Sequence, residues 1–250
     1  MKGILVRWTA GALAASALCL PAGCGRKQDS PPPAVKAPEA PGTELPQVEP
    51  RLCTAVAILI DASTSMNQSV RGSDGAKRPK HEIARAALER IIEQTAAAEK
   101  RRPDLSLRLG ILRFSSSIEE ILPIAPFEPE AARAALGRIR PSSGTAIGRA
   151  VAAGFEALRA TGCVRQHLIA ITDGENTSGP SPEMVARDLH ARTRGEVAIH
   201  FVAFDTSARR FGFLKDVGGS AIEAADGAEL EACLTEIYSK RILAEAMPGE

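Results

Sequence analysis

An alternation of two hydrophobic periods constrains the fold of this chain more than any other feature. Continuous apolar runs occur in "TAVAILI", "LSLRLGILRF", "HLIAIT" and "VAIHFVAF". Between them, apolar residues recur at helical spacing, and one such stripe consists of Ile83, Ala87, Leu88, Ile91 and Ile92. Strands that are apolar on both faces, alternating with amphipathic helices, indicate a mostly parallel sheet covered on both sides. We therefore predict an α/β domain with a Rossmann-like, doubly wound sheet.

One strand of this sheet should run in the opposite direction. The segment "IEEILPI", Ile118–Ile124, follows the second apolar run after only "SSS". That link is too short for a crossover helix, so we predict an antiparallel strand at the edge of the sheet. Two further helical stripes complete the pattern: Ile147, Val151, Phe155 and Leu158, then Leu230, Leu234, Ile237 and Tyr238.

Residues 1–24 have the layout of a secretory signal peptide. Lys2 and Arg7 form a short basic start. The apolar run that follows, Trp8 to Leu20, is too short to remain as a membrane span. The following "PAGC" resembles a bacterial lipoprotein signal, which implies that Cys24 becomes the lipid-bearing N-terminus. The usual pattern has Leu three residues before the cysteine. Pro21 stands there instead, which leaves cleavage without lipid as the alternative.

The segment from residue 25 to residue 50 differs in composition from the rest. It is dense in Pro, lacks aromatic residues and shows no regular period, so we predict a disordered tether. By resemblance to lipoproteins, the chain would be exported and anchored at the bacterial cell envelope through a lipid. Resemblance to enterobacterial lipoprotein sorting implies that Gly25, in place of Asp after Cys24, favours the outer membrane, facing the periplasm. We predict the folded domain over residues 51–246 and a short tail at 247–250.

The composition argues against nucleic-acid binding. The formal net charge of the 250 residues is +1 at pH 7, and aromatic residues make up 4% of them. A charge near zero supplies no bulk attraction for a polyanion, and few aromatic side chains are available to stack on bases. We therefore expect no nucleic-acid partner.

Oxygen-bearing side chains follow the apolar runs at positions that should share one edge of the sheet. Asp61, Ser63 and Ser65 follow the first run in "DASTS", and Asp173 follows "LIAIT" in "TDG". Thr145 ends "PSSGT", just before a helical stripe. Ligands of open parallel sheets bind outside the carboxyl ends of the strands. Hard oxygen donors without His or Cys suit Mg²⁺ first, with Mn²⁺ or Ca²⁺ as alternatives.

The three motifs together resemble the metal-ion-dependent adhesion site of a von Willebrand factor type A (vWA) domain, and the similarity extends over nearly all of Cys53–Ile242. The resemblance implies the vWA fold and a divalent metal held by Asp61, Ser63, Ser65, Thr145 and Asp173. Glu175 and Asn176 are expected at the rim of this site. The resemblance also implies that an open coordination position of the metal accepts a Glu or Asp of a partner protein.

Other interpretations of these residues remain open. Asp61 and the two serines are favoured residues for capping a helix, as is Thr145, and Asp173 suits a turn. At the level of function, a structural or assembly domain with an incidental metal is one alternative to the interaction module. Phosphoryl transfer through an aspartyl nucleophile is another. That chemistry generally pairs a second Asp two residues later, where this chain has Ser63, and we predict that the protein is not an enzyme.

Two cysteines of the domain are candidates for a disulfide. Cys53 lies eight residues before Asp61, and Cys163 lies ten residues before Asp173. The vWA resemblance implies that their strands are neighbours, so both should lie at the edge opposite the candidate metal site. An exported protein can keep a disulfide. The two-residue difference in spacing leaves free thiols as the alternative.

Overall fold

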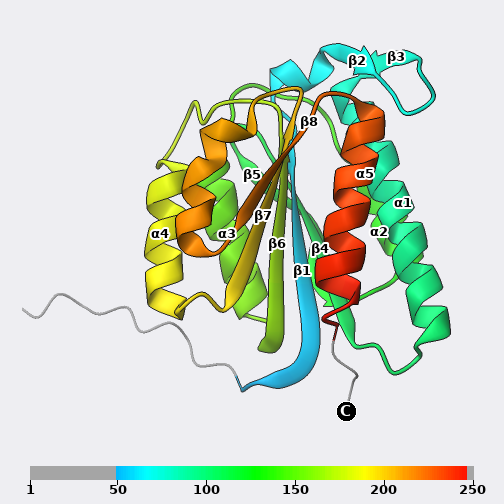
Figure 1. The fold of residues 1–250 in the computed structure, drawn as a ribbon, viewed down its shortest axis with the longest axis vertical. Coiled ribbons are helices and arrows are strands. Elements are labelled where there is room, and N and C mark those ends of the chain that lie inside the picture. Colours follow the sequence, from blue (N-terminus) through cyan, green and yellow to red (C-terminus); the bar gives the residue numbers. More distant parts are fainter. Residues whose placement is uncertain (1–48, 247–250) are drawn as a thin grey trace, which may run out of the picture. The chain divides into compact units, whose positions relative to one another are not determined.

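The computed structural model describes residues 49–246, and its main feature is a six-stranded sheet (Figure 1). The strand order is β5-β4-β1-β6-β7-β8. All neighbouring strands are parallel except β5, which is antiparallel to β4. The strands are β1 (Arg51–Asp61), β4 (Leu107–Phe114), β5 (Ile118–Pro126), β6 (Cys163–Thr172), β7 (Val197–Phe204) and β8 (Ser220–Ala224). Both the predicted α/β fold class and the antiparallel edge strand are confirmed.

Helices cover both faces of the sheet (Figure 1). On one face lie α1 (Lys80–Arg101), α2 (Pro129–Leu136) and α5 (Gly227–Ile237), and on the other α3 (Ile147–Arg159), α4 (Pro182–Thr193) and the 3₁₀ segment η2 (Ala208–Val217). The central strand shows why its apolar run is continuous. Ile58 and Ile60 pack into the core on the α1 side, whereas Ala57 and Leu59 pack on the α3 side. A strand that is buried on both faces has no solvent side on which polar residues could alternate.

Several short elements were not evident in the sequence. Edge strand β8 is only five residues long, and its residues Ser220 to Glu223 are half-buried or exposed. A two-stranded hairpin, β2 (Ser69–Arg71) and β3 (Lys77–Pro79), follows the 3₁₀ turn η1 (Thr64–Asn67). A π-helical turn, η3 (Tyr238–Leu243), continues α5. Short, polar strands at an edge lack the periodic pattern that identifies a buried strand.

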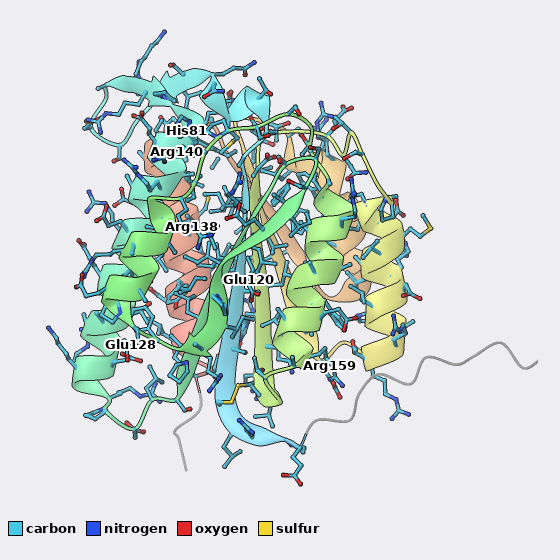
Figure 2. All side chains as sticks on the ribbon, turned by 180° about the vertical axis from the view of Figure 1, so that it is seen from behind. His81, Glu120, Glu128, Arg138, Arg140 and Arg159 are labelled. Carbon is cyan, nitrogen blue, oxygen red and sulfur yellow. A yellow bond between two sulfur atoms is a disulfide. The ribbon has the colours of Figure 1, made fainter. Side chains whose placement is uncertain are left out.

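A disulfide joins Cys53 of β1 to Cys163 of β6 at the end of the sheet where both strands begin. The β1–β6 register shifts between Arg51 and Thr54, and Cys53 lies within this irregular stretch. Its Cα is 4.8 Å from that of Cys163, which is within the range that a disulfide can bridge. Figure 2 shows Arg159 and Glu128 toward this end, with His81 and Arg140 toward the opposite end, near the β2–β3 hairpin.

Several predictions concern residues that the structure does not describe. The signal peptide with Cys24, all but the last two residues of the tether, and the tail at 247–250 lie outside residues 49–246. Within that described range, none of the helices combines the length and apolar character that crossing a bilayer requires.

Candidate metal centre

The first part of the candidate site lies where β1 ends. Asp61 is the last residue of this strand and is fully buried. Its Oδ1 accepts a 2.7 Å hydrogen bond from the backbone N–H of Ser63, and its Oδ2 accepts a 2.6 Å bond from the hydroxyl of Thr172. Thr172 ends the neighbouring strand β6, so the parallel pairing of β1 and β6 brings these groups together.

A chain of hydrogen bonds connects the two serines to the second carboxylate. Ser65 Oγ donates to Asp173 Oδ1 at 2.7 Å, and Ser63 Oγ lies 2.9 Å from Ser65 Oγ. Because Ser65 has a single hydroxyl hydrogen, the hydrogen between the two serines comes from Ser63. The lone pairs of Ser63 Oγ are therefore left available to accept or to coordinate.

Thr145 reaches the same edge of the sheet from the loop before α3. Its backbone carbonyl accepts a 2.8 Å bond from the N–H of Thr177, in the loop that follows Asp173. A Cβ placed on Gly174 would lie 3.8 Å from Thr145 Oγ1. The loop before Thr145 is also joined to the β1 end, since the N–H of Ser142 donates to the carbonyl of Ala62 at 2.6 Å. The fold thus gathers the three sequence motifs at one edge.

The capping interpretation does not describe the contacts of Ser63 or Thr145, whereas Asp61 does make a local bond, accepting from the backbone N–H of Ser63. Ser63 precedes η1 but makes no side-chain capping bond, and the residue that precedes α3 is Ala146, not Thr145. Among the side-chain hydrogen bonds, those of Ser63 and Ser65 run to each other and to Asp173. The serine hydroxyls therefore belong to the polar cluster rather than to the adjacent helical turn.

Burial is the main electrostatic property of Asp61. Desolvation raises the pKa of this carboxyl from its ordinary value of 3.8 to about 6, although hydrogen bonds from Thr172 and Ser63 oppose the rise. The negative charge of Asp173 adds a smaller increase. The charge of a neighbouring carboxylate disfavours the ionised form of Asp61, and a cation bound beside both carboxylates would relieve this repulsion.

A buried ammonium group also belongs to the cluster, contributed by Lys80, the first residue of α1. Its Nζ is 2.9 Å from Asp173 Oδ2, 2.7 Å from Asp205 Oδ2 and 3.2 Å from Gln68 Oε1. Only 3% of the Lys80 side chain is exposed. Burial alone lowers the pKa of Lys80, but hydrogen bonds and charges of Asp205 and Asp173 outweigh it and raise this pKa above its ordinary value.

Neither Lys80 nor Asp205 is among the residues that the sequence singles out. Asp205 directly follows "VAIHFVAF", so the rule that identified polar residues after the other buried strands applies to it as well. Lys80 stands in "AKRPKHE", where nothing separates it from the neighbouring basic residues. Its role depends on the β2–β3 hairpin and the start of α1, which together bring it to the strand ends.

The two expected rim residues differ in what they do. Glu175 forms an ion pair with Arg210, and both side chains are exposed. Asn176 holds the loop in place instead, because its side chain accepts from the N–H of Gly148 at 3.3 Å and donates to the carbonyl of Pro180 at 3.1 Å. Neither is hydrogen-bonded to the serine and aspartate cluster.

The donor set is compatible with a hard divalent cation. It offers two carboxylates and three hydroxyl groups, all oxygen donors of the type that Mg²⁺ and Ca²⁺ prefer. Within residues 49–246, no group of three or more His, Cys, Asp or Glu side chains is arranged to hold a metal. A metal at this edge would therefore depend on the hydroxyl groups of Ser63, Ser65 and Thr145 as well as on the carboxylates.

Comparison with known proteins agrees with this architecture. Residues 56–175, which include all five candidate ligands, match the family model of the von Willebrand factor type A domain. No curated protein sequence matches the chain.

Three solved structures show the extent of the structural likeness. The PilB minor pilin from Streptococcus sanguinis has a TM-score of 0.63 at 12% identity, over 79% of this chain and 63% of that one. The von Willebrand factor type A structure from Catenulispora acidiphila has a TM-score of 0.59 at 20% identity, over 75% of this chain and 42% of that one. BatB from Bacteroides thetaiotaomicron has a TM-score of 0.59 at 18% identity, over 77% of this chain and all of that one (100%).

The match covers less than two thirds of the pilin and of the Catenulispora structure. At these identities, the likeness shows a shared fold. The matched family model and the sheet order lead to the same result: the chain contains a von Willebrand factor type A domain.

Proposed function

We propose that this vWA domain binds a divalent cation, Mg²⁺ in the first place, and uses it to bind an acidic side chain of a partner protein outside the cytoplasm. The observation that carries the proposal is the hydrogen-bonded chain of oxygen atoms from Ser63 through Ser65 to Asp173, beside the buried carboxylate of Asp61, which accepts from the backbone N–H of Ser63. These groups come from two different strand ends, and no secondary-structure requirement explains why all of them converge.

The residues that would hold the metal are Asp61, Ser63, Ser65, Thr145 and Asp173. Serine and threonine hydroxyls are neutral donors, so the negative charge of the ligand set comes from Asp61 and Asp173 alone. Mg²⁺ retains exchangeable water, which supplies a position for an outside carboxylate. The chain's own residues hold and orient the ion, and the proposal assigns them no catalytic step.

Basic side chains beside the site loops support an acidic partner. The Arg149 guanidinium on α3 donates to the carbonyl of Ser116 and to Ser178 Oγ, thereby joining two loops that border Thr145. Arg210 also lies at the rim, although Glu175 balances its charge. Exposed cations around a binding edge attract acidic surfaces and increase the rate of encounter with them.

The location outside the cytoplasm, with a lipid on Cys24 and a Pro-rich tether, is part of the same proposal. A disulfide between Cys53 and Cys163 suits an oxidising compartment and supports export. Lipidation would hold the domain at the envelope, within reach of envelope proteins. The lipid would then be its anchor.

A structural role without any metal is the second candidate, and one contact favours it. Lys80 Nζ already neutralises Asp173 at 2.9 Å, so the cluster contains an internal cation. A purely structural domain would keep its partner when divalent ions are removed.

Titration with Mg²⁺ tests the metal directly. Isothermal titration calorimetry of the purified protein should give a binding isotherm that Asp61→Ala removes. The matched control is Asp188→Ala on α4, an exposed aspartate in an ion pair with Arg192, which should bind Mg²⁺ as the wild type does. Equal Mg²⁺ binding by the wild type and Asp61→Ala would rule out the proposed ligand set.

Crosslinking and pull-down from the native envelope test the partner. Capture should decrease when EDTA replaces Mg²⁺, and it should decrease equally with Asp61→Ala in the presence of Mg²⁺. Capture that survives both changes would favour the metal-independent structural domain.

A further inference from the structure

The ammonium group of Lys80 is fully coordinated by acceptors. Its three hydrogen-bond partners are Asp173 Oδ2 at 2.9 Å, Asp205 Oδ2 at 2.7 Å and Gln68 Oε1 at 3.2 Å. An ammonium has three donors, so every one of them is used. A lysine that is 3% exposed is uncommon, because burying a charge is costly unless it is paired.

Lys80 determines how Asp173 is presented. The side chain of Asp173 has no exposed surface, and Lys80 occupies its Oδ2. The other oxygen, Oδ1, accepts from Ser65 Oγ and so faces the serine pair. The lysine thereby occupies one oxygen of this carboxylate and neutralises its charge, while Ser65 holds the other oxygen at the place where the hydroxyl groups converge.

Asp205 is the second carboxylate paired with Lys80. It follows β7 and adopts a left-handed backbone with φ of 52°, which is uncommon for a residue other than glycine. Its N–H donates to the carbonyl of Ala224 at 2.7 Å, which anchors it at the strand end. The Asp205 side chain is 42% exposed, so it contributes charge to Lys80 without being enclosed in the cluster.

We propose that Lys80 is a positioning residue that competes with the divalent cation for Asp173 and thereby sets the metal affinity. The carboxylate of Asp205 offsets part of the charge of Lys80 and so weakens this competition. This inference rests on the proposed function. An ammonium bonded to a ligand carboxylate repels an incoming cation, whereas a second carboxylate on the ammonium weakens that repulsion. Lys80 and Asp205 should therefore change the affinity in opposite directions when each is neutralised.

Two variants test this pair of effects by calorimetric titration with MgCl₂. Lys80→Met removes the positive charge and keeps most of the side-chain volume, so its Mg²⁺ affinity should rise on the order of tenfold. Asp205→Asn removes the offsetting charge and leaves Lys80 paired with Asp173 alone, so its affinity should fall by a similar factor.

Thermal unfolding provides a readout that a merely structural role would not move. In EDTA, Lys80→Met should be less stable than the wild type because two carboxylates lose their partner. The increase in melting temperature on adding Mg²⁺ should be larger for Lys80→Met than for the wild type, and smaller for Asp205→Asn. If Lys80 had only a structural role, Lys80→Met would lower the melting temperature by the same amount with and without Mg²⁺. If Lys80→Met does not fold, Asp205→Asn still tests the proposal, because its Mg²⁺ affinity should fall, and an unchanged affinity would overturn the role of Lys80.

The outcomes separate the two proposals. Mg²⁺ binding by the wild type, with both variants within twofold of it or shifted in the same direction, would overturn the role of Lys80 alone. The absence of Mg²⁺ binding in the wild type and both variants would overturn the metal site and the role of Lys80 together. Opposite shifts in the two variants would support both.

Discussion

Acidification should destabilise this domain through two buried histidines. His167 on β6 is 3% exposed and His200 on β7 is 6% exposed, and their rings stack with centroids 6.1 Å apart. Neither nitrogen of His167, nor Nε2 of His200, has a hydrogen-bond partner within the described residues, whereas His200 Nδ1 lies 2.8 Å from Ser220 Oγ. A positive charge on either ring would be buried beside the other ring without a counter-charge hydrogen-bonded to it.

The pKa values give the size and sign of the effect. Burial lowers the pKa of both histidines from 6.5 to about 4. The charge of Arg165 lowers the pKa of His167 further. The charges of His167 and Arg241 lower the pKa of His200 further, and that of Glu245 raises it. Between these values the unfolded chain binds more protons than the folded one, so stability is lost as pH falls below 6.5. Lowering the pH from 7 to 5 should cost about 2 kcal/mol per histidine.

The measurement is the free energy of unfolding in urea at pH 7, 6 and 5 in EDTA. Asp61 acts in the opposite direction, because its pKa of about 6 lies above the unfolded value and its protonation stabilises the folded state as pH falls. Comparing the wild type with His167→Gln/His200→Gln cancels this contribution. The wild type should lose about 4 kcal/mol more than the double variant. An identical pH dependence in the two proteins would refute the assignment.

Two further predictions concern the packing of the site loops and the crosslink. A Cβ on Gly148 would lie 2.1 Å from the carbonyl oxygen of Pro180, so Gly148→Ala should destabilise the fold by about 2 kcal/mol. Gly212→Ala, where a Cβ meets nothing within 4 Å, is the control in the same chemical-denaturation assay, and equal losses would contradict the packing argument. The disulfide closes a loop with a sequence separation of 110 residues. Replacing Cys53 and Cys163 together by Ala should cost about 4 kcal/mol, and an unchanged unfolding free energy would show that the crosslink does not stabilise the domain.

The parts of the fold that were predictable are those with a strong periodic pattern. Val56 to Ile60 are buried on both faces of the sheet, which is the environment that a continuous apolar run of strand length indicates when helical stripes flank it. Strand β8 and the β2–β3 hairpin were not predictable, because these strands are only five and three residues long and most of their side chains are half-buried or exposed. Their pairing depends on neighbouring elements, which local sequence does not specify.

The sequence by itself determined the chemistry of the candidate site: oxygen donors at Asp61, Ser63 and Ser65, and again at Thr145 and Asp173, placed where parallel strands and a helix meet one edge. Only the tertiary structure placed Lys80 among these groups, with its ammonium shared between Asp173 and Asp205. The physical reason is that charge pairing is a matter of distance in space. A lysine in a basic stretch has the same sequence signature whether its ammonium lies in water or is buried against carboxylates, and only the chain's path through β2, β3 and α1 distinguishes the two.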